Sequence, residues 1–267
     1  MTTETPQYPA AVEGPTPGVA LVTGAADRVG AAIARRLAAA GWAVLVHYRS
    51  SAVKAEATAD SIRANGGRAA AIGADLADRS QRAGLIAAAA GPFGPLTLLV
   101  NNASIFERDA VFDLDETLWD AHFAVHAEAP AFLSRDFAAQ LPVGRAGNII
   151  NIIDERVLDL SPAYFSYTLS KSVLWTMTRT LAQSLAPRIR VNAIAPGPTV
   201  PPPHVTAEAH ARRLTELPLG TSADEAGIAA GVMAVLGLPA MTGQMLALDG
   251  GEHLEFPDRR GPTARRK

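Results

Sequence analysis

The feature that most constrains the fold is an alternation between short, uninterrupted apolar runs and longer segments with helical periodicity. The apolar runs lie at 19–23, 43–48, 69–74, 96–102, 147–153, 189–195 and 244–250. The helical patterns lie between them, at roughly 28–41, 51–65, 78–90, 115–140, 165–186 and 223–237. Strands that are apolar at every position are buried on both faces. Repeated β-α-β units with right-handed crossovers therefore predict an α/β fold, a doubly wound parallel sheet of about seven strands flanked by helices.

Nothing in the pattern marks a second domain. The chain has 267 residues, enough for one large core. We predict a single domain over 18–256, preceded by a disordered Pro-rich leader at 1–17 and followed by a disordered basic tail at 257–267. The least regular internal segment, Pro198 to Pro218, is expected to form a mobile loop with a short helix. It either contributes to a ligand site, since ligands bind at the carboxyl ends of strands in open α/β sheets, or only covers the sheet.

Composition excludes several classes of protein and site. The formal net charge of −2 argues against a nucleic-acid surface or a polybasic membrane-binding face. The absence of cysteine excludes disulfides, zinc-thiolate sites and thiol catalysis, and we predict no metal site. The N-terminus lacks the basic and apolar regions of a signal peptide, and no run of about 18 apolar residues is present to span a bilayer. We expect a soluble, cytoplasmic protein.

A tyrosine and a lysine four residues apart, with an aspartate upstream, form the candidate catalytic group. Tyr167 and Lys171 share one face of a predicted helix, and Asp154 precedes Tyr167 by 13 residues. A nearby ammonium favours the phenolate, so we expect Lys171 to lower the pKa of Tyr167 from about 10 and make it a usable proton donor. The pattern alone also fits an ordinary amphipathic helix. A nucleotide site upstream favours the catalytic interpretation.

The first apolar run leads directly into a glycine-containing turn and then a helix. Gly24 permits a tight turn, and Gly30 allows the helix to pack closely on the strand. The free amides and positive dipole end of such a helix favour a pyrophosphate. We predict cofactor contacts from Gly24, Arg28, Val29 and Gly30.

The second run ends without the acidic residue that holds a ribose 2′-hydroxyl in NAD-selective sites. Arg49 can instead form paired hydrogen bonds to a 2′-phosphate, with His47 and Ser50 as further donors. Arg49 also fits a solvated loop arginine. Arg28 is placed to reach the same phosphate. The missing acid favours NADPH.

Further cofactor contacts are predicted after the third and fourth runs. Asp75, which precedes Leu76, either meets the adenine amino group or caps the next turn. The fourth run ends in Asn102, Ala103 and Ser104, and asparagine there either holds the backbone of an irregular turn or contacts the cofactor.

These motifs together resemble the short-chain dehydrogenase/reductase family over about residues 18–251. The resemblance rests on the Thr23–Gly30 turn, Asp75, Asn101-Asn102-Ala103, the Tyr167/Lys171 pair, Pro196-Gly197 and Asp249-Gly250-Gly251. It implies a Rossmann-type fold, NAD(P)-dependent hydride transfer and a homotetramer. It also implies that Tyr167, Lys171, Pro196 and Gly197 contact the cofactor.

Four departures from the common family pattern are informative. Arg28 replaces a glycine of the turn, Asp154 replaces the catalytic serine, Ser104 replaces the glycine of N-N-A-G, and His126 replaces the asparagine of the catalytic set. The first three resemble the pteridine reductase branch of the family, which includes dihydromonapterin reductases. In that branch the arginine faces phosphate and pterin, an aromatic residue after N-N-A-S stacks on the pterin, and the Asp, Tyr and Lys carry the proton chemistry.

The resemblance implies a substrate site made by Arg28, Ser104, Phe106, Asp154 and Tyr167. Reducing a pterin C=N bond requires a hydride from NADPH and a proton at a ring nitrogen, and an acid beside a tyrosine can supply or relay that proton. Three alternatives stay open. Phe106 either stacks on the pterin or only covers its own loop. Either Asp154, which the spacing to Tyr167 favours, or Glu155 points inward. His126 either takes the place of the family asparagine in the site or is a core or interface residue.

The predicted function is NADPH-dependent reduction of a 7,8-dihydropterin, such as dihydromonapterin, dihydrobiopterin or dihydrofolate, to the tetrahydro form. One alternative is a carbonyl reductase of the 3-oxoacyl or sugar type, which the carboxylate of Asp154 disfavours because it opposes a developing oxyanion. Another is a non-catalytic NADPH-binding sensor, which the Tyr167/Lys171 pair disfavours. The side chain of the accepted pterin depends on the Pro198–Pro218 segment, and the sequence does not define it.

Overall fold

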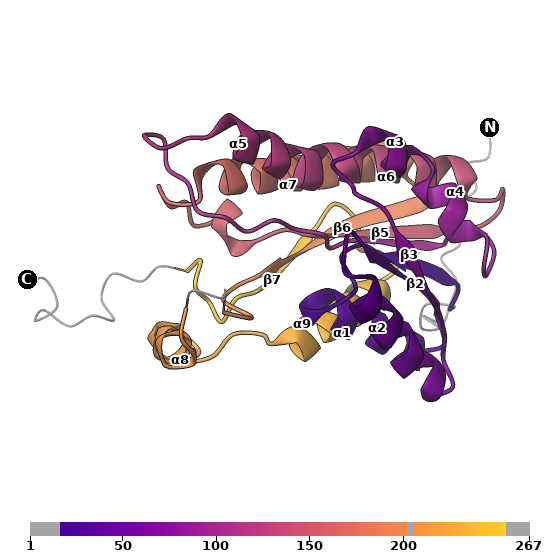
Figure 1. The fold of residues 1–267 in the computed structure, drawn as a ribbon, viewed down its shortest axis with the longest axis horizontal. Coiled ribbons are helices and arrows are strands. Elements are labelled where there is room, and N and C mark those ends of the chain that lie inside the picture. The colour runs from indigo at the N-terminus through magenta and orange to yellow at the C-terminus, as the bar shows by residue number, and fades with distance from the viewer. Residues whose placement is uncertain (1–16, 202–204, 255–267) are drawn as a thin grey trace, which may run out of the picture.

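The computed structural model describes residues 17–201 and 205–254, which form a seven-stranded sheet between two layers of helices (Figure 1). Every pair of neighbouring strands is parallel, and the order is β3-β2-β1-β4-β5-β6-β7. The strands are β1 Val19–Val22, β2 Ala43–Tyr48, β3 Arg68–Gly73, β4 Leu98–Asn101, β5 Gly147–Ile152, β6 Ile189–Pro196 and β7 Met245–Leu248. The predicted doubly wound sheet and its seven strands are confirmed. The predicted leader, apart from Pro17, and the predicted tail lie outside the described residues.

Helices cover both faces of the sheet. The α-helices are α1 Arg28–Ala39, α2 Ala52–Ala64, α3 Arg79–Ala83, α4 Leu85–Ala90, α5 Glu116–Phe123, α6 Ala129–Gln140, α7 Phe165–Leu185, α8 Ala207–Glu216 and α9 Glu225–Leu236. Helices α1, α2 and α9 lie on one face, and α3 to α7 lie on the other (Figure 1). Helix α8, the short helix expected in the irregular segment, stands apart from both layers. In the described part of the chain, no helix is long and apolar enough to cross a bilayer.

Two helices differ from the sequence prediction, and one short helix was missed. The pattern at 78–90 is divided at Gly84 into α3 and α4. The pattern at 115–140 is interrupted by a π-helical turn, η1 Ala124–Glu128, between α5 and α6. A 3₁₀ turn, η2 Glu155–Val157, follows β5. Single π turns within α-helices are frequent at functional sites, and this one carries His126.

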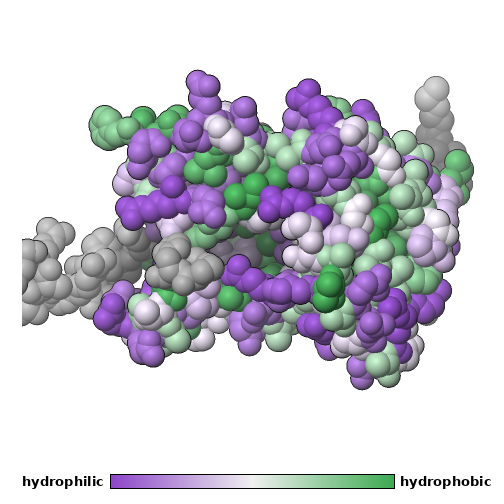
Figure 2. All heavy atoms as spheres, viewed as in Figure 1, coloured by the Kyte–Doolittle hydropathy of each residue, from purple (hydrophilic) through white to green (hydrophobic). Residues whose placement is uncertain are grey.

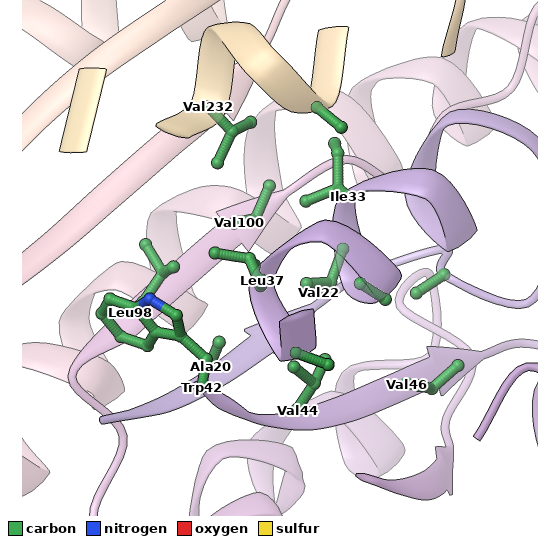
Figure 3. Close-up of a cluster of buried hydrophobic side chains, with 14 of the residues drawn as sticks. Ala20, Val22, Ile33, Leu37, Trp42, Val44, Val46, Leu98, Val100 and Val232 are labelled. Atoms are coloured by element: carbon green, nitrogen blue, oxygen red, sulfur yellow. The ribbon is translucent and has the colours of Figure 1, made fainter. Parts of the chain in front are cut away.

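The core lies on both faces of the sheet because successive strand residues point to opposite sides. Val22 of β1 belongs to the cluster packed under α1 and α9, together with Leu37 and Val232 (Figure 3). Its neighbour Leu21 belongs to the opposite cluster, which includes Phe137 of α6. Each fully buried side chain of this size contributes roughly 1.5–3 kcal/mol, so both faces hold the strands in register.

The sheet order reverses direction at β1, whose neighbours are β2 and β4. In open α/β sheets, ligands bind at the carboxyl ends of the strands beside such a switch point. The space-filling view shows a hollow between the two helical layers, rimmed by polar side chains (Figure 2). The carboxyl ends of β1 and its neighbouring strands are therefore the expected place for a ligand site.

Candidate active site

The turn after β1 is built by backbone that approaches other backbone closely. Gly24 has φ +62°, and a Cβ there would lie 2.9 Å from Ala103 Cα. A Cβ on Gly30 would lie 2.3 Å from the carbonyl oxygen of Gly24. Neither position accepts a side chain without movement of the backbone. The turn therefore places the N-terminus of α1, with its free amides, directly at the switch point.

Arg28 occupies an unusual backbone conformation at the start of α1. Its φ of +51° lies in the left-handed region, where glycine is normally preferred. Its guanidinium is exposed and donates a hydrogen bond of 3.1 Å to the carbonyl oxygen of Val200. Arg28 therefore joins the turn after β1 to the segment that leads to α8.

His47 supports the turn and does not offer a donor to a phosphate, so its predicted role is wrong. The Gly24 N–H donates to His47 Nδ1 at 3.1 Å, which leaves the proton on Nε2 to donate to the carbonyl oxygen of Ala74 at 3.0 Å. The ring is buried, and burial lowers its pKa to about 4. Both nitrogens are used by the backbone in a neutral ring.

The other predicted nucleotide residues lie around the same edge. Arg49 and Ser50 are exposed after β2. Asp75 Oδ1 accepts the backbone N–H of Ala77 at 2.9 Å, which is the turn-capping alternative, and the side chain of Leu76 is buried in the core. Their cofactor contacts stay predictions.

The ends of β1 and β4 are joined by hydrogen bonds. Asn102 Nδ2 donates to the carbonyl oxygens of Thr23 at 2.9 Å and Gly24 at 3.2 Å. Thr23 Oγ1 accepts the backbone N–H groups of Asn102 and Ala103 at 2.9 and 3.0 Å. Asn102 therefore holds the irregular turn, which is one of its two predicted roles.

At the end of β6, Gly197 permits a further close approach of two segments. A Cβ at Gly197 would lie 2.7 Å from Asp249 Cα, in the turn that follows β7. Together with Pro196, this places the predicted Pro-Gly motif at the same carboxyl edge as the β1 turn.

Asp154 and Tyr167 are in direct contact, as their spacing predicted. The Tyr167 hydroxyl donates to Asp154 Oδ2 at 2.7 Å. Asp154 Oδ1 also accepts the backbone N–H of Arg156 at 3.1 Å and thereby caps the η2 turn. The side chain of Asp154 is 16% exposed, and that of Tyr167 is buried. Asp154, not Glu155, therefore faces the tyrosine.

The pKa of Tyr167 changes in the direction opposite to the prediction. Burial, followed by the charge of Asp154 and the hydrogen bond to it, raises the pKa of Tyr167 well above 10. Arg156 and a hydrogen bond with Ser104 oppose that rise. Lys171 Nζ lies 5.7 Å from the Tyr167 ring centroid and donates to the carbonyl oxygen of Ile152 at 2.9 Å. Burial lowers the pKa of Lys171 itself to about 8.

Glu155, next to Asp154, is the more deeply buried of the two carboxyl groups. Its side chain is 3% exposed, and Arg156 Nη1 lies 3.2 Å from its Oε1. Burial and the charge of Asp154 outweigh that contact and raise the pKa of Glu155 to about 8. Glu155 is therefore mostly protonated at neutral pH.

An aromatic group borders the Asp154–Tyr167 pair. The rings of Phe106 and Tyr164 are stacked, with centroids 4.5 Å apart and planes at 11°. Phe106 also meets Tyr167 edge to face at 4.9 Å. Among the described residues, Tyr164 is the one aromatic ring that stacks parallel to Phe106.

His126 connects the loop after β4 to the helix that carries Tyr167. Its Nε2 accepts the backbone N–H of Ile105 and lies 3.1 Å from Ser104 Oγ, so the proton is on Nδ1 and is donated to Ser170 Oγ at 2.8 Å. Ser170 Oγ in turn donates to the carbonyl oxygen of Tyr167 at 2.7 Å. Burial holds the pKa of His126 well below its usual range. His126 is thus a buried residue within the site.

Three residues of the site were missed by sequence reasoning. They are Arg156, Tyr164 and His122, which stacks on His126 at 5.5 Å. Tyr164 precedes Tyr167 by three residues and is the N-cap of α7, so its closeness in the chain was the available signal. Nothing in the local pattern indicated that Arg156 is partly buried beside Asp154.

The residues at the β1 turn fit a dinucleotide. The backbone approach at Gly24 and Gly30, the free end of α1 and the exposed Arg49 provide room, amides and positive charge for its phosphates. In the described residues, no group of three or more His, Asp or Glu side chains is arranged to hold a metal ion.

Comparison with known proteins agrees with this geometry. FolM alternative dihydrofolate reductase 1 from Brucella canis, solved with NADP, is 45% identical, with a TM-score of 0.85 over 94% of this chain and 98% of that one. Its counterpart from Brucella suis, also solved with NADP, is 47% identical, with a TM-score of 0.86 over 92% and 98%. The 3-oxoacyl-[acyl-carrier-protein] reductase FabG of Staphylococcus aureus is 32% identical over 240 residues, 88% of this chain and 98% of the relative.

The sequence pattern of the family described as short chain dehydrogenase matches residues 18–212. That range contains the β1 turn, the Asn102 turn and the Asp154–Tyr167–Lys171 group. The order of the parallel strands brings these motifs to one edge of the sheet. The chain belongs to the short-chain dehydrogenase family.

Proposed function

We propose that this oxidoreductase is an NADPH-dependent pteridine reductase that converts a 7,8-dihydropterin to its tetrahydro form. The observation that carries the proposal is the 2.7 Å hydrogen bond from Tyr167 to Asp154 beside Phe106. Asp154 places a carboxyl group beside Tyr167, at the position where reduction of a carbonyl calls for a neutral hydrogen-bond donor to the oxygen. The two FolM proteins, at 45% and 47% identity, support the same substrate class.

The proposed cofactor site uses Gly24, Val29 and Gly30 at the β1 turn, with Arg28 and Arg49 for the phosphates. When bound, NADPH supplies the hydride for the ring carbon of the substrate. The further contacts predicted from Asp75, Ala103 and Ser104 belong to the same proposal. Lys171, buried beside Tyr167, is proposed to hold the cofactor ribose.

The chain's own residues supply the proton. Because Tyr167 has a raised pKa, its hydroxyl is protonated at neutral pH and donates to Asp154. We place the proton that reaches the ring nitrogen on this hydrogen-bonded pair. Phe106 offers a flat surface next to the pair, and we propose that it stacks on the pterin.

A carbonyl reductase is the second candidate, favoured by the 32% identity to FabG over 88% of this chain. Its reaction develops negative charge on a carbonyl oxygen. Asp154 would oppose that charge at the position beside Tyr167. We therefore rank it below pterin reduction.

A homotetramer and a cytoplasmic location stay predictions. An apolar groove of about 570 Å³ runs along α7, lined by Phe123, Leu169, Val173 and Met177 among others, and it supports association of subunits. Light scattering on the eluting peak of a sizing column measures the mass directly.

The deciding experiment follows NADPH absorbance with 7,8-dihydromonapterin, 7,8-dihydrobiopterin and dihydrofolate, with an acetoacetyl thioester as the carbonyl substrate and NADH as the alternative cofactor. We expect turnover of a dihydropterin with NADPH that is lost in Asp154→Ser. Turnover of the thioester alone would support a carbonyl reductase. NADPH binding without turnover of any substrate would overturn the proposal in favour of a sensor.

A further inference from the structure

Arg156 is a partly buried arginine that neither the family pattern nor the proposed proton pair assigns. It lies in the η2 turn directly after β5, and its side chain is only 15% exposed. Its Nη1 lies 3.2 Å from Asp154 Oδ1 and 3.2 Å from Glu155 Oε1. Burying a guanidinium is costly unless its partners are fixed, so this one has a defined position.

The same guanidinium lies against the aromatic group. Its Cζ is 5.1 Å from the Tyr164 centroid and 5.6 Å from the Phe106 centroid. Those two centroids are 4.5 Å apart, so a point at these distances lies beside the stack and not beyond an outer face of either ring. Arg156 therefore braces both rings and leaves the outer face of Phe106 uncovered by it.

We propose that Arg156 is a positioning residue for the proton-delivery step, an inference that rests on the proposed function. By holding Asp154 Oδ1, it leaves Oδ2 directed at the Tyr167 hydroxyl. By contacting Phe106 and Tyr164, it fixes the aromatic surface relative to that pair. One side chain thus sets the distance between the substrate surface and the proton source.

Arg156 also supplies positive charge to groups that are otherwise pushed toward their protonated forms. It opposes the rise in the pKa of Tyr167 and of Glu155. The other charged neighbours that act on these two groups are Asp154, Arg213 and Glu252, and a hydrogen bond with Ser104 lowers the pKa of Tyr167. The titratable side chains of His122, His126 and Lys171 lie against the Tyr167 ring. Removing the guanidinium should raise both pKa values.

The test compares three variants of the full-length protein. Arg156→Met keeps length and removes charge, while Arg156→Lys keeps charge and removes the planar fork. The matched control is Arg179→Met, because Arg179 is an exposed arginine whose Cζ lies 5.9 Å from the Trp175 ring, outside the site. Melting temperature and NADPH affinity are measured for each to establish folding.

We expect Arg156→Met to lower kcat for the dihydropterin by roughly 10-fold to 100-fold with NADPH affinity within about twofold. Arg156→Lys, which keeps the positive charge, should give an intermediate kcat. An Arg156→Met enzyme with wild-type kcat, like Arg179→Met, would overturn the proposal.

A substrate-independent measurement separates this inference from the proposed function. Carboxyl carbon NMR, with Glu155→Gln for assignment, follows the titration of Glu155 in the free protein. We expect its midpoint to rise from about 8 in Arg156→Met and to stay near the wild-type value in Arg179→Met. If wild type turns over no pterin but this midpoint rises, the proposed function fails while the placement of Arg156 stands. An unmoved midpoint contradicts the placement itself.

Discussion

Two aspartates cap the turns that follow β1 and β5, and they differ in almost everything else. Asp27 accepts the N–H of Arg28 at 2.8 Å, and Asp154 accepts the N–H of Arg156 at 3.1 Å. Asp27 is 56% exposed and pairs with Lys54, itself 63% exposed. Asp154 is 16% exposed and accepts the Tyr167 hydroxyl. Both side chains cap the turn that follows them, but only Asp154 is sheltered from solvent and in contact with a tyrosine.

The contrast extends to the groups around each aspartate. The hydrogen bond from Lys54 and then that from Arg28 lower the pKa of Asp27, as expected for an exposed, paired carboxylate. Around Asp154, burial and the Asp154 charge raise the pKa values of Tyr167 and Glu155. The β1 turn is therefore built from backbone and solvated charges, whereas the β5 turn gathers groups that hold protons.

The largest effect should come from neutralising the two caps in turn. Asparagine is as good a cap as aspartate, so both Asp154→Asn and Asp27→Asn should keep their turns. We expect Asp154→Asn to lower kcat for a dihydropterin by about 10²-fold to 10⁴-fold, the range for loss of a general acid–base group. Asp27→Asn should change kcat by less than about twofold. Equal losses in the two variants would break the comparison.

Glu155 should make the stability of the β5 turn depend on pH. Its pKa is raised from 4.5 to about 8 on folding, so between these values the native state holds a proton that the unfolded chain has released. The free energy of unfolding should therefore fall as pH rises from about 5 to 9, by about 4 kcal/mol from this group. Urea unfolding of Glu155→Gln should show a correspondingly flatter profile. A variant with the wild-type slope would show that Glu155 does not hold the proton.

The smallest effect tests the backbone construction of the β1 turn. Gly30→Ala would place a Cβ 2.3 Å from the Gly24 carbonyl, whereas Gly84→Ala meets nothing within 4 Å. We expect Gly30→Ala to cost roughly 1–3 kcal/mol of stability and to weaken NADPH binding by about 10-fold to 100-fold. Gly84→Ala should leave both unchanged. Fluorescence titration with NADPH measures the affinities, and similar values for the two variants would contradict the close approach.

Much of the fold could be predicted because its signals are local. The seven apolar runs correspond to the seven strands, and helices began close to the expected positions except where Gly84 and the π turn divide them. The contact between Asp154 and Tyr167 followed from their spacing after β5 and at the start of α7. These elements depend on periodicity and on residues that lie close together in the chain.

The errors concern partners that come from distant segments. His47 was expected to face a phosphate, but the N–H of Gly24 and the carbonyl of Ala74 use both of its nitrogens. Lys171 was expected to lower the pKa of Tyr167, but burial, followed by the charge of Asp154 and the hydrogen bond to it, raises that pKa. Neither outcome is visible in a local pattern.

The sequence by itself determined the doubly wound sheet, the position of the nucleotide turn and the pairing of Asp154 with Tyr167. Tertiary structure decided which of these groups are neutral, which are charged and which are used by the backbone. The physical reason is that apolar periodicity acts along the chain, whereas a pKa depends on desolvation and on charges within about 6 Å. Arg156 shows the difference most clearly, since its role depends on Phe106 and Tyr164 meeting beside it.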